Sequence, residues 1–137
     1  MFNASSRCQN GLSINDTLLI DPKLQQDLFA ILLRFRAKPV ALTADVKQMF
    51  RQIWVNSEQC DYQLVWRFSE SDPVLDYLLK TVTFGFTSSP FLAIYCLLQL
   101  ALKYREKYPL AFAALFEALY VDDIVISVCT VEQARAH

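Results

Sequence analysis

The spacing of hydrophobic residues changes along this chain and indicates a succession of different elements. In residues 22–36 apolar positions recur every three or four residues, which predicts an amphipathic helix with a proline near its start. Residues 39–46 form a short apolar run that stops at Asp45. This second segment predicts a buried strand that ends in a charge.

The middle of the chain has the alternating pattern of β-structure. Apolar and polar residues alternate in residues 61–68, which is the spacing of a half-buried strand. Residues 69–73 have a turn sequence, and residues 75–84 can return as the partner strand. We therefore expect an antiparallel hairpin here.

Helical spacing returns after this hairpin. Residues 91–104 are apolar on nearly every side, which predicts a buried helix with Ser89 as its N-cap and Pro90 in its first position. Residues 110–117 predict a shorter helix, and ALYVDDIVISV at residues 118–128 predicts a strand–turn–strand hairpin. This order of elements predicts a single α+β domain with helices on one face of an antiparallel sheet.

Composition and charge narrow the class of protein. The chain has 137 residues, of which 54% are hydrophobic and only two are glycine, so it can bury a core. Its four cysteines form no C-x-x-C pair and its single histidine is His137, which argues against a zinc site and a histidine-activated nucleophile. The net charge of −1 counts against a self-sufficient nucleic-acid binder. With no signal-peptide pattern and no apolar run of membrane-spanning length, no membrane partner is expected.

Asp122 and Asp123 are adjacent carboxylates inside an apolar run. Ionised groups in apolar surroundings are costly unless something positive neutralises them. Asp45 ends another apolar strand, so three carboxylates converge at one edge of the sheet if the two strands are neighbours. Such hard oxygen ligands suit Mg²⁺, and two ions about 3.5–4 Å apart can clamp a phosphoryl transfer. The other interpretation is an ordinary hairpin turn, with Asp45 as a cap or turn residue.

Three short motifs follow one another along the chain. They are TADVKQMF at residues 43–50, TFGFTSSPF at residues 83–91 and YVDD at residues 120–123. In this order and at this spacing they resemble motifs of reverse transcriptases. The stretch SSRCQNGLSINDTLLIDPKLQQDLFAILLRFR, followed by ALTADVKQMFRQI and TVTFGFTSSPFLA, is similar to the polymerase of Bel/Pao-type long-terminal-repeat retrotransposons. The resemblance covers nearly the whole chain.

This resemblance implies a two-metal nucleotidyltransferase site. Asp45 and Asp122 would be the main ligands of two Mg²⁺ ions, for which Mn²⁺ could substitute. Asp123 would be the accessory carboxylate, and the carbonyl of Val46 would lie beside the metal. One ion would make the primer 3′-hydroxyl more nucleophilic toward the α-phosphate of a deoxynucleotide, and the other would stabilise the departing pyrophosphate.

The resemblance also assigns residues to the nucleotide and the primer. Phe50 would lie under the sugar of the incoming nucleotide and exclude a 2′-hydroxyl. Phe84 and Gly85 would pack near the templating pair, and Tyr120 would lie near the primer end. Without the motif, Phe50 is better interpreted as a core aromatic residue at the start of a helix.

The fold implied by the resemblance is a polymerase palm, an antiparallel sheet backed by helices, with part of the fingers. Residues 1–38 would be partial fingers, and residues 39–137 would be palm with a fingers insertion. Its partners would be an RNA or DNA template with its primer, deoxynucleoside triphosphates, and thumb and ribonuclease H domains of a longer polyprotein. Since those domains would lie downstream, we expect the chain alone to be inactive. Its location would be the cytoplasm or the inside of virus-like particles.

Two departures and two alternatives qualify this interpretation. Asn3 stands where relatives tend to carry Asp, and Phe84 stands where many carry Gln. The main alternative is a decayed or co-opted retrotransposon remnant that acts as a folded interaction module without catalysis. An RNA-dependent RNA polymerase is less compatible with Phe50, because an enzyme that makes RNA must accept the 2′-hydroxyl.

Overall fold

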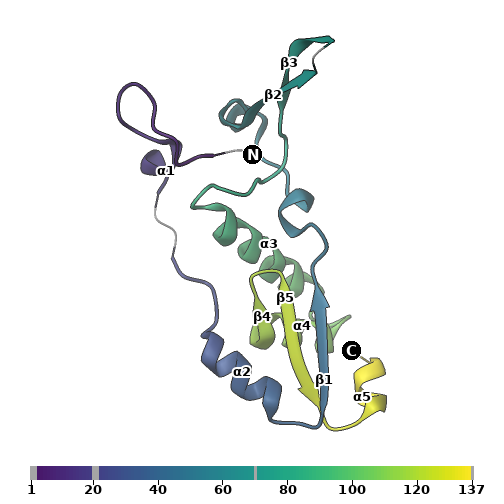
Figure 1. Ribbon diagram of the computed structural model, residues 1–137. Coiled ribbons are helices and arrows are strands. Elements are labelled where there is room, and N and C mark those ends of the chain that lie inside the picture. Colours follow the sequence, from purple (N-terminus) through teal and green to yellow (C-terminus); the bar gives the residue numbers. More distant parts are fainter. Residues whose placement is uncertain (1–2, 20–21, 70, 137) are drawn as a thin grey trace. The chain divides into compact units, whose positions relative to one another are not determined.

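The computed structural model describes residues 3–19, 22–69 and 71–136 (Figure 1). Contacts divide the chain into two compact units. The first unit comprises Met1–Pro22 and Gln48–Ala93, and the second comprises Lys23–Lys47 and Ile94–His137. The chain mixes helices with antiparallel strands, as an α+β protein does.

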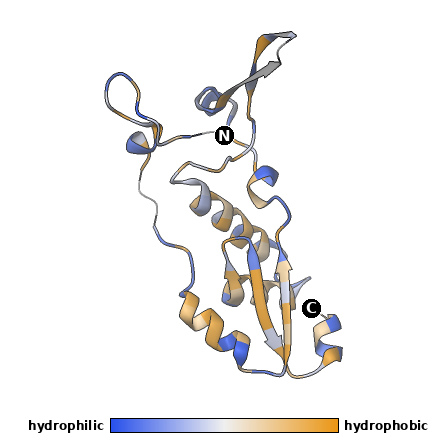
Figure 2. Ribbon diagram, viewed as in Figure 1, coloured by the Kyte–Doolittle hydropathy of each residue, from blue (hydrophilic) through white to orange (hydrophobic). Residues whose placement is uncertain are grey.

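The second unit is built on a three-stranded antiparallel sheet. Its strands are β1 (Val40–Asp45), β4 (Leu119–Tyr120) and β5 (Asp123–Val128), in the order β1-β5-β4. The β-branched run Ile124–Ile126 in β5 favours a strand, and Figure 2 shows that β5 is hydrophobic over most of its length, with its start hydrophilic. The register of β1 on β5 runs from Val40 opposite Val128 to Asp45 opposite Asp123.

Helices cover this sheet. Both α2 (Leu28–Arg36) and α4 (Pro109–Ala118) contact β5 and each other, while α5 (Val131–Ala136) contacts β1 and β5. Ile31 of α2 is fully buried. Arg34 ties the layers together, because its guanidinium donates to the carbonyl of Glu117 and its own carbonyl accepts from the Ser127 hydroxyl at 2.7 Å. The helix–sheet packing therefore fixes where β5 lies.

The first unit has short elements. They are α1 (Ile14–Thr17), the 3₁₀ helices η1 (Met49–Gln52) and η2 (Ser57–Gln63), and the strands β2 (Leu64–Ser69) and β3 (Asp72–Leu78). The two strands pair antiparallel, which confirms the predicted central hairpin. Helix α3 (Ser89–Tyr104) begins in this unit and continues into the second. No helix in the described part of the chain is both long and apolar enough to span a membrane.

Three predicted boundaries are wrong. The helix expected over residues 22–36 begins only at Leu28, because the Asp27 carboxylate caps it by accepting from the N–H of Phe29 at 3.2 Å. The strand expected over residues 61–68 begins only at Leu64, because residues 61–63 belong to the 3₁₀ helix η2, which the Asn56 side chain caps. The strand expected over residues 75–84 is β3, which runs over Asp72–Leu78.

The expectations for α3 also need correction. Ser89 is the first residue of the helix, and its hydroxyl donates to the carbonyl of Thr83 at 2.6 Å, so it is not the N-cap. The helix is not buried throughout, since Leu100 is 52% exposed while Ala93 is fully buried. By contrast, the predicted helix over residues 110–117 is confirmed as α4, which has Pro109 in its first turn.

Candidate active site

Asp45 and Asp123 lie directly opposite each other where β1 ends and β5 begins. Residues opposite each other on antiparallel strands have side chains on the same face, with Cβ atoms about 4.5–5.5 Å apart. Both side chains are exposed. One residue further on, the Val46 N–H donates to the carbonyl of Asp122 at 2.8 Å, so the pairing extends beyond the carboxylates. The condition under which the carboxylates come together, that these two strands are neighbours, is therefore met.

Tyr120 extends this row across the sheet. It pairs with Asp123 on the side of β5 away from β1. Because opposite residues share a face, Tyr120, Asp123 and Asp45 form one row over the three strands. A phenol group next to two carboxylates gives the row both hydrogen-bond donor and acceptor capacity.

Asp122 occupies a two-residue turn between β4 and β5 and is half-buried. The turn of the predicted hairpin therefore contains Asp122 but not Asp123, since Asp123 is the first residue of β5. The other turn residue, Val121, has φ = 57°, in the left-handed region. A β-branched residue rarely adopts this region, and such strain costs about 1–3 kcal/mol. The turn beside the carboxylates therefore holds backbone strain.

Gln25 holds this strained turn with both ends of its amide group. Its Nε2 donates to the carbonyl of Leu119 at 2.8 Å, and its Oε1 accepts from the N–H of Val121 at 2.9 Å. The side chain is half-buried, on the segment that precedes α2. Sequence reasoning missed this residue, because nothing in the local sequence around Gln25 indicates partners in β4 and its turn.

The row of carboxylates places like charges opposite each other, which is destabilising unless a cation intervenes. Within the described residues, no three His, Cys, Asp or Glu side chains are arranged to hold a metal ion. Mg²⁺ does not require such a group, since it commonly takes one or two protein carboxylates and completes its shell with water and phosphates. Asp45 and Asp123, exposed on one face, are oxygen ligands of this kind. The donor set fits a hard divalent cation, with Asp122 next to it in the turn.

The predicted nucleotide-contacting residues belong to the first unit. Phe50, in η1, is 5% exposed, and its ring centroid lies 4.5 Å from that of Phe84, which is 60% exposed. Phe50 thus occupies the position of a core aromatic residue, with Phe84 packed against it. Its contact with a sugar stays a prediction.

The Gly85 loop is fixed by Asn15, a residue that sequence reasoning also missed. Gly85 has φ = 106°, which favours glycine. The Asn15 Nδ2 donates to the carbonyl of Gly85 at 2.9 Å, and its Oδ1 accepts from the N–H of Thr87 at 3.0 Å. Asn15 lies on α1, which begins with a capping box between Ser13 and Asp16.

No protein-family model matches this chain, and no curated protein matches it.

Proposed function

We propose that this chain is the fingers–palm part of an RNA-directed DNA polymerase of the Bel/Pao retrotransposon type, a nucleotidyltransferase. The observation that supports the proposal is the register of β1 on β5. It sets Asp45 opposite Asp123, with Asp122 in the adjoining turn. The carboxylates come from two motifs that are far apart in the sequence, and the sheet brings their backbones together at one end.

In the proposed reaction, Asp45, Asp122 and Asp123 hold divalent cations at the end of the sheet. When bound, the cations would supply charge for activating a primer 3′-hydroxyl and for stabilising the departing pyrophosphate. The chain's own part is positional, because the strand register and the Gln25 clamp fix the carboxylate-bearing backbone before any ligand arrives. Small displacements matter in such a site, since a misplacement of about 1 Å can cost on the order of 100-fold in rate.

Tyr120 shares the face of the carboxylates, which supports its proposed place near the primer end. Phe50, Phe84 and Gly85 are proposed to contact the nucleotide and the templating pair, and the carbonyl of Val46 to lie beside the metal. A template with its primer and deoxynucleoside triphosphates would then be the ligands. The net charge of −1 means that other domains of a longer protein would supply much of the positive surface for nucleic acid.

The alternative function is an inactive remnant that serves as an interaction module. Divalent-cation binding at the end of the sheet distinguishes the two proposals, because an interaction module has no need for it.

The first experiment is a titration of the purified chain with Mg²⁺, followed by ¹H–¹⁵N NMR. Saturable shifts are expected for the amides of Asp45, Asp122 and Asp123, and Asp45→Asn should weaken binding at least several-fold because it removes a ligand. Asp61→Asn is the matched control, since Asp61 is an exposed carboxylate of the first unit. Unchanged affinity in Asp45→Asn would contradict the metal site.

The second experiment is primer extension by a longer protein that contains this segment with a thumb. Asp122→Asn should abolish incorporation, while Asp61→Asn should not. Phe50→Val should raise the kcat/KM for ribonucleotides relative to deoxynucleotides, because the ring is proposed as a steric wall. The isolated chain should give no measurable extension. An active Asp122→Asn protein would overturn the proposed function.

A further inference from the structure

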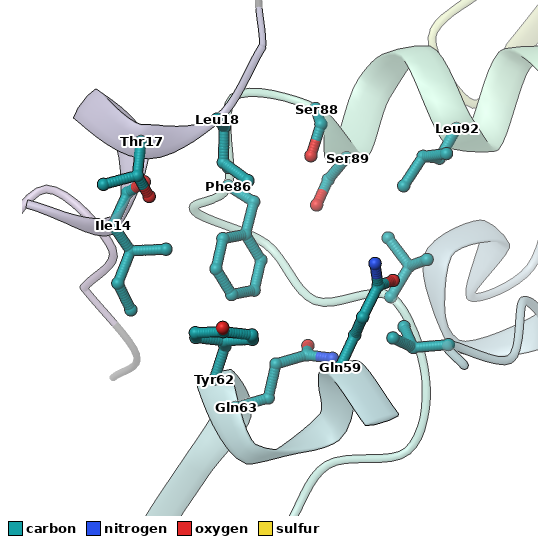
Figure 3. Close-up of a pocket in the computed structure, with 12 residues that line it drawn as sticks. Ile14, Thr17, Leu18, Gln59, Tyr62, Gln63, Phe86, Ser88, Ser89 and Leu92 are labelled. Carbon is teal, nitrogen blue, oxygen red and sulfur yellow. The ribbon is translucent and has the colours of Figure 1, made fainter. Parts of the chain in front are cut away.

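A pocket of about 410 Å³ lies within the first unit, between α1, η2 and the segment that leads into α3 (Figure 3). Small-molecule sites commonly have volumes of about 300–1,000 Å³. The pocket therefore has room for a ligand of roughly two fused rings. It contains none of the carboxylates or aromatic residues assigned to the polymerase reaction.

The wall of this pocket is largely apolar. Among the described residues that line it, none is Asp, Glu, Lys, Arg or His. Tyr62 and Phe86 bring aromatic rings from two different elements, and Figure 3 shows both rings on the side of Ile14. Since a charged ligand would lose hydration here without gaining a partner, phosphates and other ions do not suit this pocket.

Gln63 contributes one unpaired polar atom to the wall of the pocket. Its side chain is 3% exposed and lines the pocket, yet its Oε1 has no hydrogen-bond partner within the described chain. Buried polar atoms are nearly always paired, so an unpaired carbonyl oxygen at a pocket wall is an acceptor available to a ligand. Ser89 is equally buried, but its hydroxyl already donates to the carbonyl of Thr83.

We propose that this pocket binds a small, neutral aromatic molecule whose ring N–H or O–H donates to Gln63 Oε1. The aromatic and aliphatic wall would bury the ring system, and the amide oxygen would fix its orientation. A purely apolar ligand would leave the oxygen unpaired, so the site selects for a donor. This inference is independent of the proposed polymerase function, because it uses none of the residues at the end of the β1–β5 sheet.

The experiment compares two probes of nearly the same shape, indole and indene, of which only indole has an N–H. Binding to the purified chain is followed by methyl NMR of Ile14, Leu18 and Leu92, which line the pocket. Indole should bind saturably at these methyl groups. Its affinity relative to indene should fall about three- to tenfold in Gln63→Met, which removes the acceptor but keeps the length of the side chain.

Gln59→Met is the matched control, because Gln59 lines the same pocket without an unpaired buried oxygen. It should leave the indole-to-indene ratio unchanged. An unchanged ratio in Gln63→Met, or no saturable shift of the lining methyl groups in the parent chain, would overturn the proposal. If Gln63→Met does not fold, the ratio of indole to indene affinity in the parent chain decides instead, and equal affinities of the two probes would overturn the proposal.

Discussion

Two loops of this protein, one in each unit, are held in the same manner. In both, a single side-chain amide donates to the carbonyl of one loop residue and accepts from the N–H of the residue two positions further along. Gln25 does this for the turn that contains Val121, and Asn15 does it for the loop that contains Gly85. An amide side chain that makes both bonds satisfies a backbone carbonyl and a backbone N–H, as a neighbouring strand would.

The two loops differ in what the amide must resist. Gly85 adopts its positive φ without strain, whereas Val121 adopts its own at a steric cost. The Gln25 bonds are also part-buried, whereas those of Asn15 are exposed and can be replaced by water. The Gln25 clamp on the turn that contains Val121 therefore opposes strain, while the Asn15 clamp on the loop that contains Gly85 only limits movement.

The largest effect is expected for Gln25→Leu, a change that leaves the carbonyl of Leu119 and the N–H of Val121 without partners. Two lost, part-buried hydrogen bonds should lower the free energy of opening the turn by about 2–3 kcal/mol. Hydrogen exchange of the Val121 amide, measured by NMR, reports this opening.

Gln26→Leu is the control for that prediction, since Gln26 is the exposed neighbour with the same side chain. It should change the exchange of Val121 by no more than about 0.5 kcal/mol. In Asn15→Leu, protection of the Thr87 amide should fall by about 1 kcal/mol, because water replaces the lost bonds. Equal losses in Gln25→Leu and Asn15→Leu would contradict the distinction between the two clamps.

Gly85→Ala should destabilise the first unit by about 1–2 kcal/mol, because the methyl group makes φ = 106° unfavourable. The measurement is urea denaturation followed at resonances of the first unit. Gly11→Ala shows the cost of a positive φ without any steric contact, since Gly11 also has a positive φ, 80°, and has open space around its Cβ position. A neutral Gly85→Ala would show that the loop relaxes around the new side chain.

A double-mutant cycle between Gln25 and Val121 isolates the strain itself. Val121→Gly removes the steric cost of the turn, so the turn should stay closed more readily without its clamp. The loss caused by Gln25→Leu should therefore be smaller by about 1 kcal/mol in the Val121→Gly background. Additive effects of the two changes, measured by exchange at residue 121, would mean that Gln25 contributes hydrogen bonds but does not oppose strain.

The smallest effect is a pH dependence of the Asn15 clamp. Hydrogen bonds from the backbone N–H and the hydroxyl of Ser13 lower the pKa of Asp16 below its usual 3.8, assisted by Arg7. A carboxyl group whose folded pKa is depressed adds stability above its unfolded pKa and loses it as the pH falls through the folded pKa. Protection of Thr87 should decline slightly below pH ~4. Asp16→Asn should remove that decline, and an unchanged profile in this variant would exclude Asp16 as its source.

Much of the second unit could be predicted from sequence, because its signals are local. The apolar runs that end at Asp45 and begin after Asp123 mark β1 and β5, but the register that sets Asp45 opposite Asp123 was not predicted. The strained φ of Val121 could not be predicted, because a valine there argues against a left-handed turn. Gln25 could not be found either, since its partners are distant in the sequence and its type is common on surfaces.

The first unit was harder to predict for a different reason. The alternation of apolar and polar residues around Tyr62 and Leu64 indicates a strand. However, the Asn56 side chain caps a 3₁₀ helix that includes Tyr62. Capping signals and periodicity compete over short segments, and the cap prevails when the apolar positions have little to pack against. The function of Phe50 could not be predicted for a similar reason, because the sequence pattern does not distinguish a buried aromatic residue from one that contacts a sugar.

The pairing of Asp45 with Asp123 also has a consequence for the order of folding. The β4–β5 hairpin is local and can form within about 1–10 μs, whereas β1 reaches β5 only after a long loop that includes most of the first unit has closed. Charge repulsion between the two aspartates therefore arises late, when β1 joins the sheet. With the proposed metal site, millimolar Mg²⁺ should speed this docking step. A stopped-flow refolding trace can follow it, because the hairpin has formed before the first recorded point.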